Sequence, residues 1–429
     1  MEPLRSHQIN DTIRLFHKIC NIVYLSCGTN FMFEDLKLPK TFIKAFDFVS
    51  KIFEVLAISI IISEWGAAFT QKELTLMQEI NVYLFACTSV TLYTMYVNTI
   101  YCKVGIRELG FRLAVTLRRM CSNDAIEKKM IKKTWKFVTA MGFIVFGFLV
   151  STGASSGYQA LTTNATFTTM IPVWPDLEDR RLVAGLGRVA HYIVWWIFVA
   201  RVGAIYFIIL AISICLEHQY STLHAYFLSL NNIFEGEGTD EEKEARYEDA
   251  FNHGIKMHSL TLCCAGQMQD TCGVAFSSQV ITNVCSLVLL MIQWIHMEHT
   301  FANVVNILLF AGCFLVGTGI FMWNAGDVTH EAAKLATAMF HSGWYNCGGQ
   351  SSVRVRKLLT IAMRQAQDEV VIRGLGIIEL SYDSYISVIL TDAYKVFSSI
   401  FHLAISLLIS FFIIFQIVKT SYSVFSVMY

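Results

Sequence analysis

Charged side chains are scarce in this chain. Lys, Arg, Asp and Glu make up 15% of its 429 residues and apolar residues make up 55%. Soluble domains carry about 25% charged and about 45–50% apolar residues. The shift excludes an ordinary soluble domain and indicates apolar surface that faces lipid. The formal net charge is zero, so the bulk charge does not favour a nucleic acid as a partner.

Proline is scarce as well. The chain has four prolines, Pro3, Pro39, Pro172 and Pro175, and none lies inside a long apolar run. Transporters with broken helices use proline and glycine interruptions within their spans. We therefore expect continuous membrane helices.

Motifs for catalysis and for metal binding are missing. The sequence has no P-loop, no His-Glu-x-x-His and no nucleophile elbow. The twelve cysteines show no metal-ligand spacing and no paired framework, and most are expected to be small core residues. We predict no enzymatic activity, no metal and no cofactor. The first eighteen residues are polar and do not resemble a signal peptide.

Long apolar runs dominate the rest of the chain. A helix needs about 20 mostly apolar residues to cross the hydrocarbon core of a bilayer. Seven segments qualify: 45–66, 78–101, 135–156, 189–215, 272–294, 302–323 and 378–401. The sequence therefore predicts an all-α polytopic membrane protein with seven transmembrane helices.

The positions of Lys and Arg orient these helices, because cytoplasmic loops accumulate basic residues. With the N-terminus inside, the inner segments hold 25 of the 33 Lys and Arg residues and the outer loops hold 4. We therefore predict a cytoplasmic N-terminus. The outer loop at 157–188 carries Asn164 in an Asn-Ala-Thr triplet, a candidate glycosylation site on the outer side.

The inner segments also have helical spacing. Apolar residues recur at helical intervals within 103–136 and within 353–366, and the segment 325–343 continues the sixth helix inward. We interpret the acidic stretch at 235–244 as a solvated loop. The helices between 324 and 374 are predicted to pack as a helical intracellular domain.

Three blocks near the C-terminus carry a recognisable pattern. They read GDVTHEAAKLATAMFHSGWYN at 326–346, KLLTIAMRQAQ at 357–367 and GLGIIELSYDSYISVILTDAYKVFSSI at 374–400. These blocks resemble the insect odorant receptor family. The resemblance implies a subunit of an odorant-gated, non-selective cation channel, in which a tuned receptor and a shared co-receptor form a heterotetramer. The implied partners are a small volatile odorant, co-receptor subunits, membrane lipid and permeating cations. The implied location is the plasma membrane, on the dendrites of olfactory sensory neurons.

This resemblance divides the chain into five parts. They are a cytoplasmic N-terminal segment (1–44), helices one to six with the ligand pocket in their outer half (45–323), an intracellular anchor region (324–374), a pore-lining seventh helix (375–401) and an extra apolar tail (402–429). The family usually ends before such a tail, in which Tyr394-Lys-Val-Phe-Ser recurs as Tyr422-Ser-Val-Phe-Ser. Three placements of the tail stay open: an eighth crossing, a re-entrant piece and an alternative last helix.

The predicted seventh helix carries a candidate gate. Leu390, Tyr394, Phe397 and Phe401 fall on one helical stripe, and a ring of large apolar residues can close a pore by dewetting. By its place in the block, Phe397 matches the gate of the family. Ordinary helix contact is the competing interpretation of this stripe.

The resemblance places the odorant site in the outer half of the bundle, among helices two, three, four and six. Such a site should be apolar and aromatic, with one or two polar groups that orient the ligand. The candidates are Tyr83, Leu84, Cys87, Phe148, Thr152, Ser155, His191, Tyr192, Trp195, Trp196, Phe301 and Val305. The competing interpretation is that Trp and Tyr near helix ends are interface anchors.

Three other classes of membrane protein compete with this interpretation. A G-protein-coupled receptor should have an outward N-terminus, proline in its spans and an Asp-Arg-Tyr or Asn-Pro-x-x-Tyr motif, and this chain shows none of these. A secondary transporter should show an inverted repeat. This sequence shows only the short repeat of the Tyr394 block at Tyr422. A gustatory receptor-type channel shares the architecture, and the 326–400 block favours the odorant branch.

Overall fold

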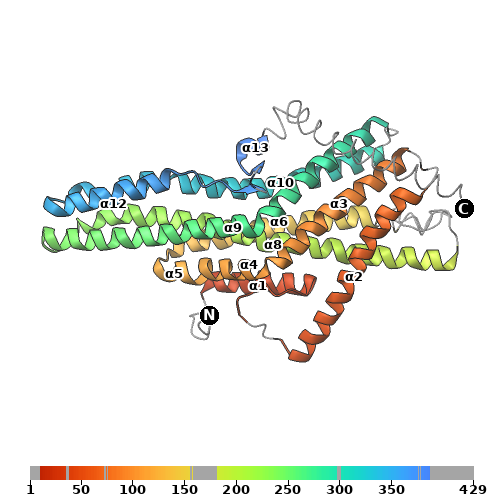
Figure 1. Cartoon of the computed structure of the whole chain (residues 1–429), viewed down its shortest axis with the longest axis horizontal. Coiled ribbons are helices and arrows are strands. Elements are labelled where there is room, and N and C mark those ends of the chain that lie inside the picture. Colours follow the sequence, from red (N-terminus) through yellow and green to blue (C-terminus); the bar gives the residue numbers. More distant parts are fainter. Residues whose placement is uncertain are drawn as a thin grey trace, which may run out of the picture.

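The computed structural model of the chain describes residues 10–34, 38–71, 74, 76–154, 157, 181–296, 301–374, 376 and 378–386. Over these residues the chain forms helices and one short antiparallel pair of strands (Figure 1). The α-helices are α1 (Asp11–Cys27), α2 (Lys40–Thr70), α3 (Leu76–Tyr101), α4 (Lys103–Phe111), α5 (Leu117–Met120), α6 (Asp124–Phe148), α8 (Leu182–Ser229), α9 (Asp240–His296), α10 (Phe301–Ala333), α11 (Leu335–Phe340), α12 (Gly349–Gln367) and α13 (Tyr382–Ile386). The other elements are the π-helical segments η1 (Arg112–Thr116) and η2 (Leu149–Ala154), the 3₁₀ turns η3 (Leu230–Ile233) and η4 (Trp344–Asn346), and the strands β1 (Arg373–Gly374) and β2 (Ile378–Glu379).

Polar side chains fix where three of these helices begin. The side chains of Asn10 and Asn123 accept hydrogen bonds from the first turns of α1 and α6. At the start of α9, the Thr239 hydroxyl accepts from the Glu242 amide at 3.3 Å, and the Glu242 carboxylate accepts from the Thr239 amide at 3.2 Å. This is a reciprocal capping box. The second half of the acidic stretch at 235–244, predicted as a loop, is therefore the first turn of α9. Negative charge at this end stabilises the helix through its dipole.

The membrane-spanning helices follow the predicted apolar runs. In the described part of the chain, four helices are long and apolar enough to cross a membrane: α3, α8, α9 and α10. The first and third predicted spans fall on α2 and on α6 continued by η2. The predicted seventh span, 378–401, begins in a strand instead of a helix, because Ile378 of β2 pairs with Gly374 of β1. Helical structure starts at α13, and the residues after Ile386 lie outside the described part of the chain. The predicted fold class, an all-α polytopic membrane protein, is confirmed.

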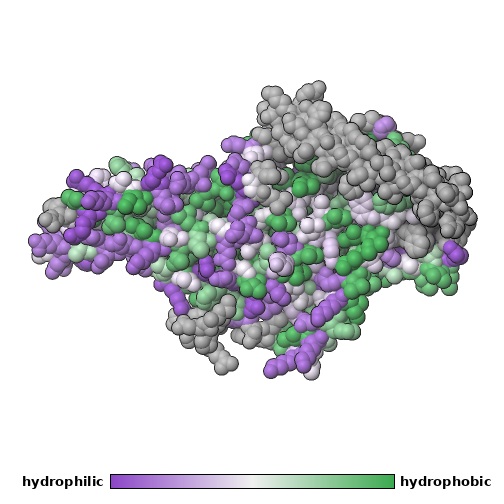
Figure 2. Space-filling view, viewed as in Figure 1, coloured by the Kyte–Doolittle hydropathy of each residue, from purple (hydrophilic) through white to green (hydrophobic). Residues whose placement is uncertain are grey.

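The molecule is elongated, with a helical bundle at one end and a narrow arm at the other (Figure 1). The arm contains α12 beside the long helices α8 and α9, which have 48 and 57 residues. Val355, Leu359 and Ala362 of α12 are buried. Hydrophilic residues cover most of the arm, whereas hydrophobic residues gather on the bundle (Figure 2). The predicted inner helix at 353–366 is therefore α12 of the arm, and the place of the arm on the cytoplasmic side stays a prediction.

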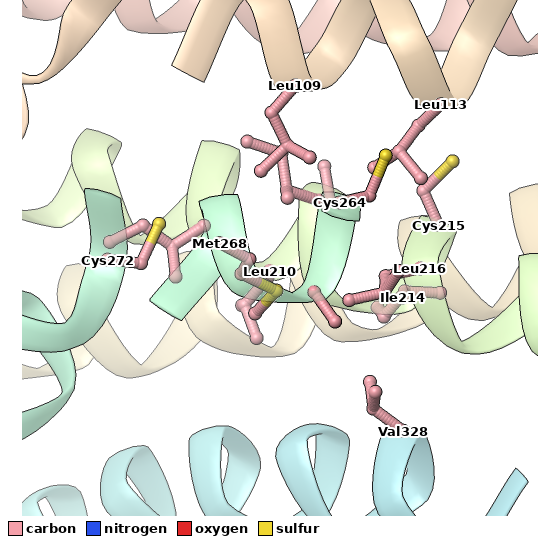
Figure 3. Close-up of a cluster of buried hydrophobic side chains, with 14 of the residues drawn as sticks. Leu109, Leu113, Leu210, Ile214, Cys215, Leu216, Cys264, Met268, Cys272 and Val328 are labelled. Carbon is pink, nitrogen blue, oxygen red and sulfur yellow. The ribbon is translucent and has the colours of Figure 1, made fainter. Parts of the chain in front are cut away.

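The core of the bundle is built around α8. Between residues 201 and 220, every residue except Phe207 is buried. Figure 3 shows side chains of this stretch, among them Leu210 and Ile214, close to side chains of α9 such as Cys264 and Met268. The most apolar window of α8 is 78% buried inside the chain, against 39% for α3. A helix that is apolar on all sides is expected at such a central position.

Arg201 of α8 lies buried in the inner half of the bundle. Its guanidinium donates a hydrogen bond of 2.8 Å to the Cys27 carbonyl at the end of α1, and another to the Ser50 hydroxyl on α2. It also pairs with Glu54 of α2 at 3.2 Å. Tyr96 of α3 donates to the same carboxylate, and its ring centre lies 5.7 Å from the guanidinium carbon. This buried cation is tolerated because three neighbouring helices supply an opposite charge and hydrogen-bond acceptors.

All twelve cysteines are free thiols. Six of them are buried, and Cys263 is exposed. Outside the membrane spans, burial raises the pKa of Cys347 to about 11, so this thiol stays protonated at neutral pH. Apart from Cys263, the cysteines act as small core or half-buried residues, as the sequence predicted.

Candidate ligand-binding site

Four helices enclose a small apolar cavity in the bundle. Its volume is about 30 Å³, which is room for one or two water molecules. A ligand of odorant size therefore requires the lining side chains to move apart. The cavity is lined by Leu84, Phe85, Thr88, Ser89, Leu92, Phe148, Trp195, Phe198, Val199, Phe310 and Phe314.

Helical spacing brings these residues to one place. Leu84, Thr88 and Leu92 recur every four residues on α3, and side chains four apart lie on the same helix face. Trp195 and Val199 have the same spacing on α8. Phe310 and Phe314 repeat it on α10. Helix α3 thus contributes about two turns of one face to the wall, α8 and α10 contribute about one turn each, and α6 contributes Phe148.

Phe148 is at the centre of the aromatic wall. Its ring centre lies 6.2 Å from that of Trp195, 5.5 Å from that of Phe310 and 6.4 Å from that of Phe314. These distances are typical of edge-to-face and tilted aromatic pairs. Phe148 is the last residue of α6 before the π-helical segment η2, and single π-helical turns are frequent at functional sites.

The two hydroxyl residues in the wall already have partners. Ser89 donates to Glu64 of α2 at 3.2 Å. Thr88 shares a hydrogen bond of 3.3 Å with Ser286 of α9. The wall therefore offers a ligand mainly apolar and aromatic contact, with these hydroxyls at one side.

The family of the chain follows from comparison with known proteins. The family model described as 7tm Odorant receptor matches residues 77–391. The chain belongs to the insect odorant receptor family. The receptor is also similar in fold to two structures of the insect olfactory receptor OR5 from Machilis hrabei. The structure in complex with eugenol gives a TM-score of 0.71 at 12% identity, covering 95% of this chain and 100% of the other. The second structure gives 0.70 at 13% identity, covering 87% and 95%. No curated protein sequence matches the chain.

The cavity includes three of the residues predicted to bind odorant. Leu84, Phe148 and Trp195 line it. Tyr83 and Cys87 are half-buried on α3 beside this wall, and Val305 is half-buried near the start of α10. Contact of these residues with an odorant stays a prediction.

Two predicted residues pack on the end of α6 instead of lining the cavity. The Tyr192 hydroxyl donates to the Gly153 carbonyl at 2.7 Å. The Trp196 ring lies directly on Gly153, so that a Cβ there would collide with it. The two rings also contact each other, with centres 6.2 Å apart. Both residues therefore hold η2 against α8, behind the cavity wall.

His191 lies in a different place. It borders an open groove between the outer parts of α2 and α8, which is also lined by Ser59, Ser63 and Gly66 of α2. The imidazole Nδ1 lies 2.8 Å from the Gly187 carbonyl of its own helix.

Several predicted residues lie outside the described part of the chain. These are Ser155, the glycosylation candidate Asn164 and the gate candidates Leu390, Tyr394, Phe397 and Phe401, together with the side chains of Thr152 and Phe301. Their roles stay predictions. Among the described residues, no group of three His, Cys, Asp or Glu side chains is placed to hold a metal ion.

The prediction missed eight residues of the cavity wall. They are Phe85, Thr88, Ser89, Leu92, Phe198, Val199, Phe310 and Phe314. Most lie one or two turns deeper in the membrane than the residues predicted on the same helices. A signal was present, since extending the predicted face from Leu84 by four and eight residues reaches Thr88 and Leu92.

Proposed function

We propose that this receptor is a subunit of an odorant-gated, non-selective cation channel and that it binds a small, mostly apolar odorant at the cavity around Phe148. The observation that carries the proposal is an aromatic cavity closed by α3, α6, α8 and α10 within an olfactory receptor fold. The matched structure from Machilis hrabei is a complex with eugenol, which is a small aromatic odorant. Binding sites for such ligands are apolar, with few polar groups.

The size of the cavity suggests how binding acts. The cavity is smaller than an odorant, so binding requires the rings around Phe148 to separate. A ligand shifts a conformational equilibrium only when it binds one state better than the other. An odorant that fits only the expanded cavity binds the expanded state better, because the contracted state excludes it.

We propose further that the receptor assembles with co-receptor subunits through its arm. Large apolar side chains are exposed on the arm, among them Phe340, Tyr345, Val353 and Ile361, which is 70% exposed. Contiguous exposed apolar surface is typical of a protein interface. In this assembly, in the plasma membrane of olfactory neurons, the segment through Phe397 lines the pore for cations.

Expression with and without the co-receptor tests the proposal. Voltage-clamped cells would be exposed to a panel of volatile alcohols, esters, aldehydes and phenols that includes eugenol. We expect a cation current with at least one of these compounds when both chains are present and no current with the co-receptor alone. Phe397→Ala should change the ion selectivity of this current. Absence of any evoked current from a receptor that reaches the cell surface contradicts the proposal.

A pair of matched variants tests the binding site. Phe148→Ala removes the central ring of the cavity, and we expect the half-maximal odorant concentration to change by about tenfold or more. Phe143→Ala removes the same ring from the same helix at a position that is 72% exposed, and it should leave the response unchanged. Equal effects of the two variants would place the site elsewhere.

A further inference from the structure

Two tyrosines of α13 dock on α10. The Tyr385 hydroxyl donates to the Leu315 carbonyl at 3.2 Å. The Tyr382 ring packs edge-on against Trp323 of α10, with ring centres 5.5 Å apart. The Tyr382 hydroxyl donates to the Asp327 carboxylate. The chain thus reaches Ile386, where the predicted pore segment continues, from a position fixed on α10.

Two glycines of α10 make room for these rings. A Cβ at Gly319 would lie 2.5 Å from the Tyr385 hydroxyl oxygen, and a Cβ at Gly326 would lie 3.3 Å from three carbons of the Tyr382 ring. The glycines are seven residues apart, which is about two helical turns, and so face the same side of α10. Each tyrosine therefore lies over one glycine, and the register between α13 and α10 is defined at two points.

The contact of Tyr382 and Tyr385 with α10 is called the joint below. A charge network connects this joint to the rest of the bundle. Lys133 of α6 pairs with Asp327 at 2.5 Å and also with Glu217 of α8. The three side chains are between 11% and 18% exposed. Such partly buried pairs are strongly directional, because little water is present to replace a lost partner. Tyr382 thereby connects α13 to α6, α8 and α10 together.

The joint and the odorant cavity share the same helices. Leu315, which accepts from Tyr385, directly follows Phe314 of the cavity wall. Lys133 lies on α6, whose last residue is Phe148. Phe314 and Leu315 are neighbours in the chain, so a shift of the α10 backbone at the cavity wall would also shift the carbonyl that accepts from Tyr385.

We infer that Tyr382, Tyr385 and Lys133 are positioning residues that hold the start of the last helix in this register on α10 in the closed channel, and that they release it when the cavity expands. The inference rests on the proposed channel function. The contacts occur together with a cavity of about 30 Å³, which is too small for an odorant. Weakening them favours opening, because the closed state loses a contact that the open state lacks.

Ligand-free current is the first test. Tyr382→Phe removes only the hydroxyl and keeps the ring over Gly326, and Tyr101→Phe makes the same change at the end of α3, at a position that is 86% exposed. With the co-receptor present and equal surface levels, Tyr382→Phe should raise the open fraction without ligand by about tenfold, the effect of losing one hydrogen bond to a charged group. Tyr101→Phe should not change it. An unchanged or lower ligand-free current in Tyr382→Phe overturns the inference.

A double-mutant cycle identifies the partner. Asp327→Asn should raise the ligand-free current by itself, and the combination with Tyr382→Phe should add little, because both changes remove one interaction. Fully additive effects of the two changes would show that Tyr382 does not act through Asp327.

Hydrogen exchange separates failure of this inference from failure of the channel proposal. In the purified complex, Tyr382→Phe should speed amide exchange at residues 381–386 by about tenfold, and Tyr101→Phe should not. If the wild-type receptor carries no current, the channel proposal fails, and only the exchange experiment tests whether Tyr382 holds α13 on α10. Unchanged protection of these amides in Tyr382→Phe then overturns the inference.

Discussion

The outer and inner halves of the bundle are held together by different interactions. Around Phe148 in the outer half, the three helices α6, α8 and α10 meet through ring contacts at 5.5 to 6.4 Å. In the inner half, Arg201 and Lys133 bind carboxylates that come from other helices. Aromatic packing holds the first region together, and ion pairs hold the second region together.

The difference has a mechanical consequence. Aromatic contacts contribute about 0.5–1.5 kcal/mol each beyond their buried area, and rings can reorient around a ligand that replaces the lost area. A buried ion pair has no such substitute, because removing one partner leaves an uncompensated charge. The outer half is therefore suited to adapt to a ligand, and the inner half is suited to remain in one of few discrete arrangements.

Removing the charge from Arg201 should have the largest effect. Arg201→Met leaves Glu54 and the Cys27 carbonyl without their cation, and we expect a loss of about 3 kcal/mol in stability. Thermal unfolding of the purified receptor measures it. Arg14→Met is the control, since Arg14 is 66% exposed and pairs with an exposed Asp11. The double variant Arg201→Met, Glu54→Leu should recover most of the loss, and no recovery would contradict an ion-pair role.

Filling the cavity should affect the response more than the stability. Val199→Phe adds a ring to the cavity wall, and we expect at least an approximately tenfold higher half-maximal odorant concentration, because overpacking opposes ligand entry by about 1–3 kcal/mol. Val189→Phe makes the same substitution at a lipid-facing position of α8 that is 42% exposed. A normal response in Val199→Phe would show that the ligand binds elsewhere.

A smaller effect is expected at Gly28, which ends α1. This residue has φ +70°, and a Cβ there would collide with the Ser50 side chain that also bonds Arg201. Gly28→Ala should cost about 1–2 kcal/mol from strain and displacement of Ser50. Gly185→Ala is the control, since nothing lies within 4 Å of its Cβ position. Equal thermal midpoints for the two variants would disprove the role of Gly28.

The smallest effect is expected for an exposed pair on the solvated side. Arg373 and Glu379 join β1 and β2 at 2.8 Å, and both side chains are about half exposed, at 50% and 51%. Arg373→Ala should change stability by less than about 0.5 kcal/mol, because exposed pairs are screened by water and salt. A loss as large as that of Arg201→Met would show that exposure does not separate the two kinds of pair.

Helix existence was predictable from the sequence, whereas helix length and side-chain contacts were less so. The predicted span at 189–215 is the apolar part of α8, which extends from Leu182 to Ser229, because helical structure continues after hydropathy falls. Helix α1 was missed as a helix, although Asn10 offered a cap and its apolar residues have helical spacing. The four helices predicted to form the ligand pocket also enclose this cavity, which lies further along them than most of the residues predicted to bind odorant.

The sequence by itself determined the membrane class, the orientation and the family of this protein. Hydropathy and basic charge are summed residue by residue along the chain. Predictions based on these sums do not depend on which helices contact each other. Only the tertiary structure decided that Lys133 meets Glu217 and Asp327, which lie 84 and 194 residues further along the chain. It also decided which faces of α3, α6, α8 and α10 surround the cavity. These contacts depend on the tilt and rotation of each helix, which its neighbours set rather than its own hydropathy.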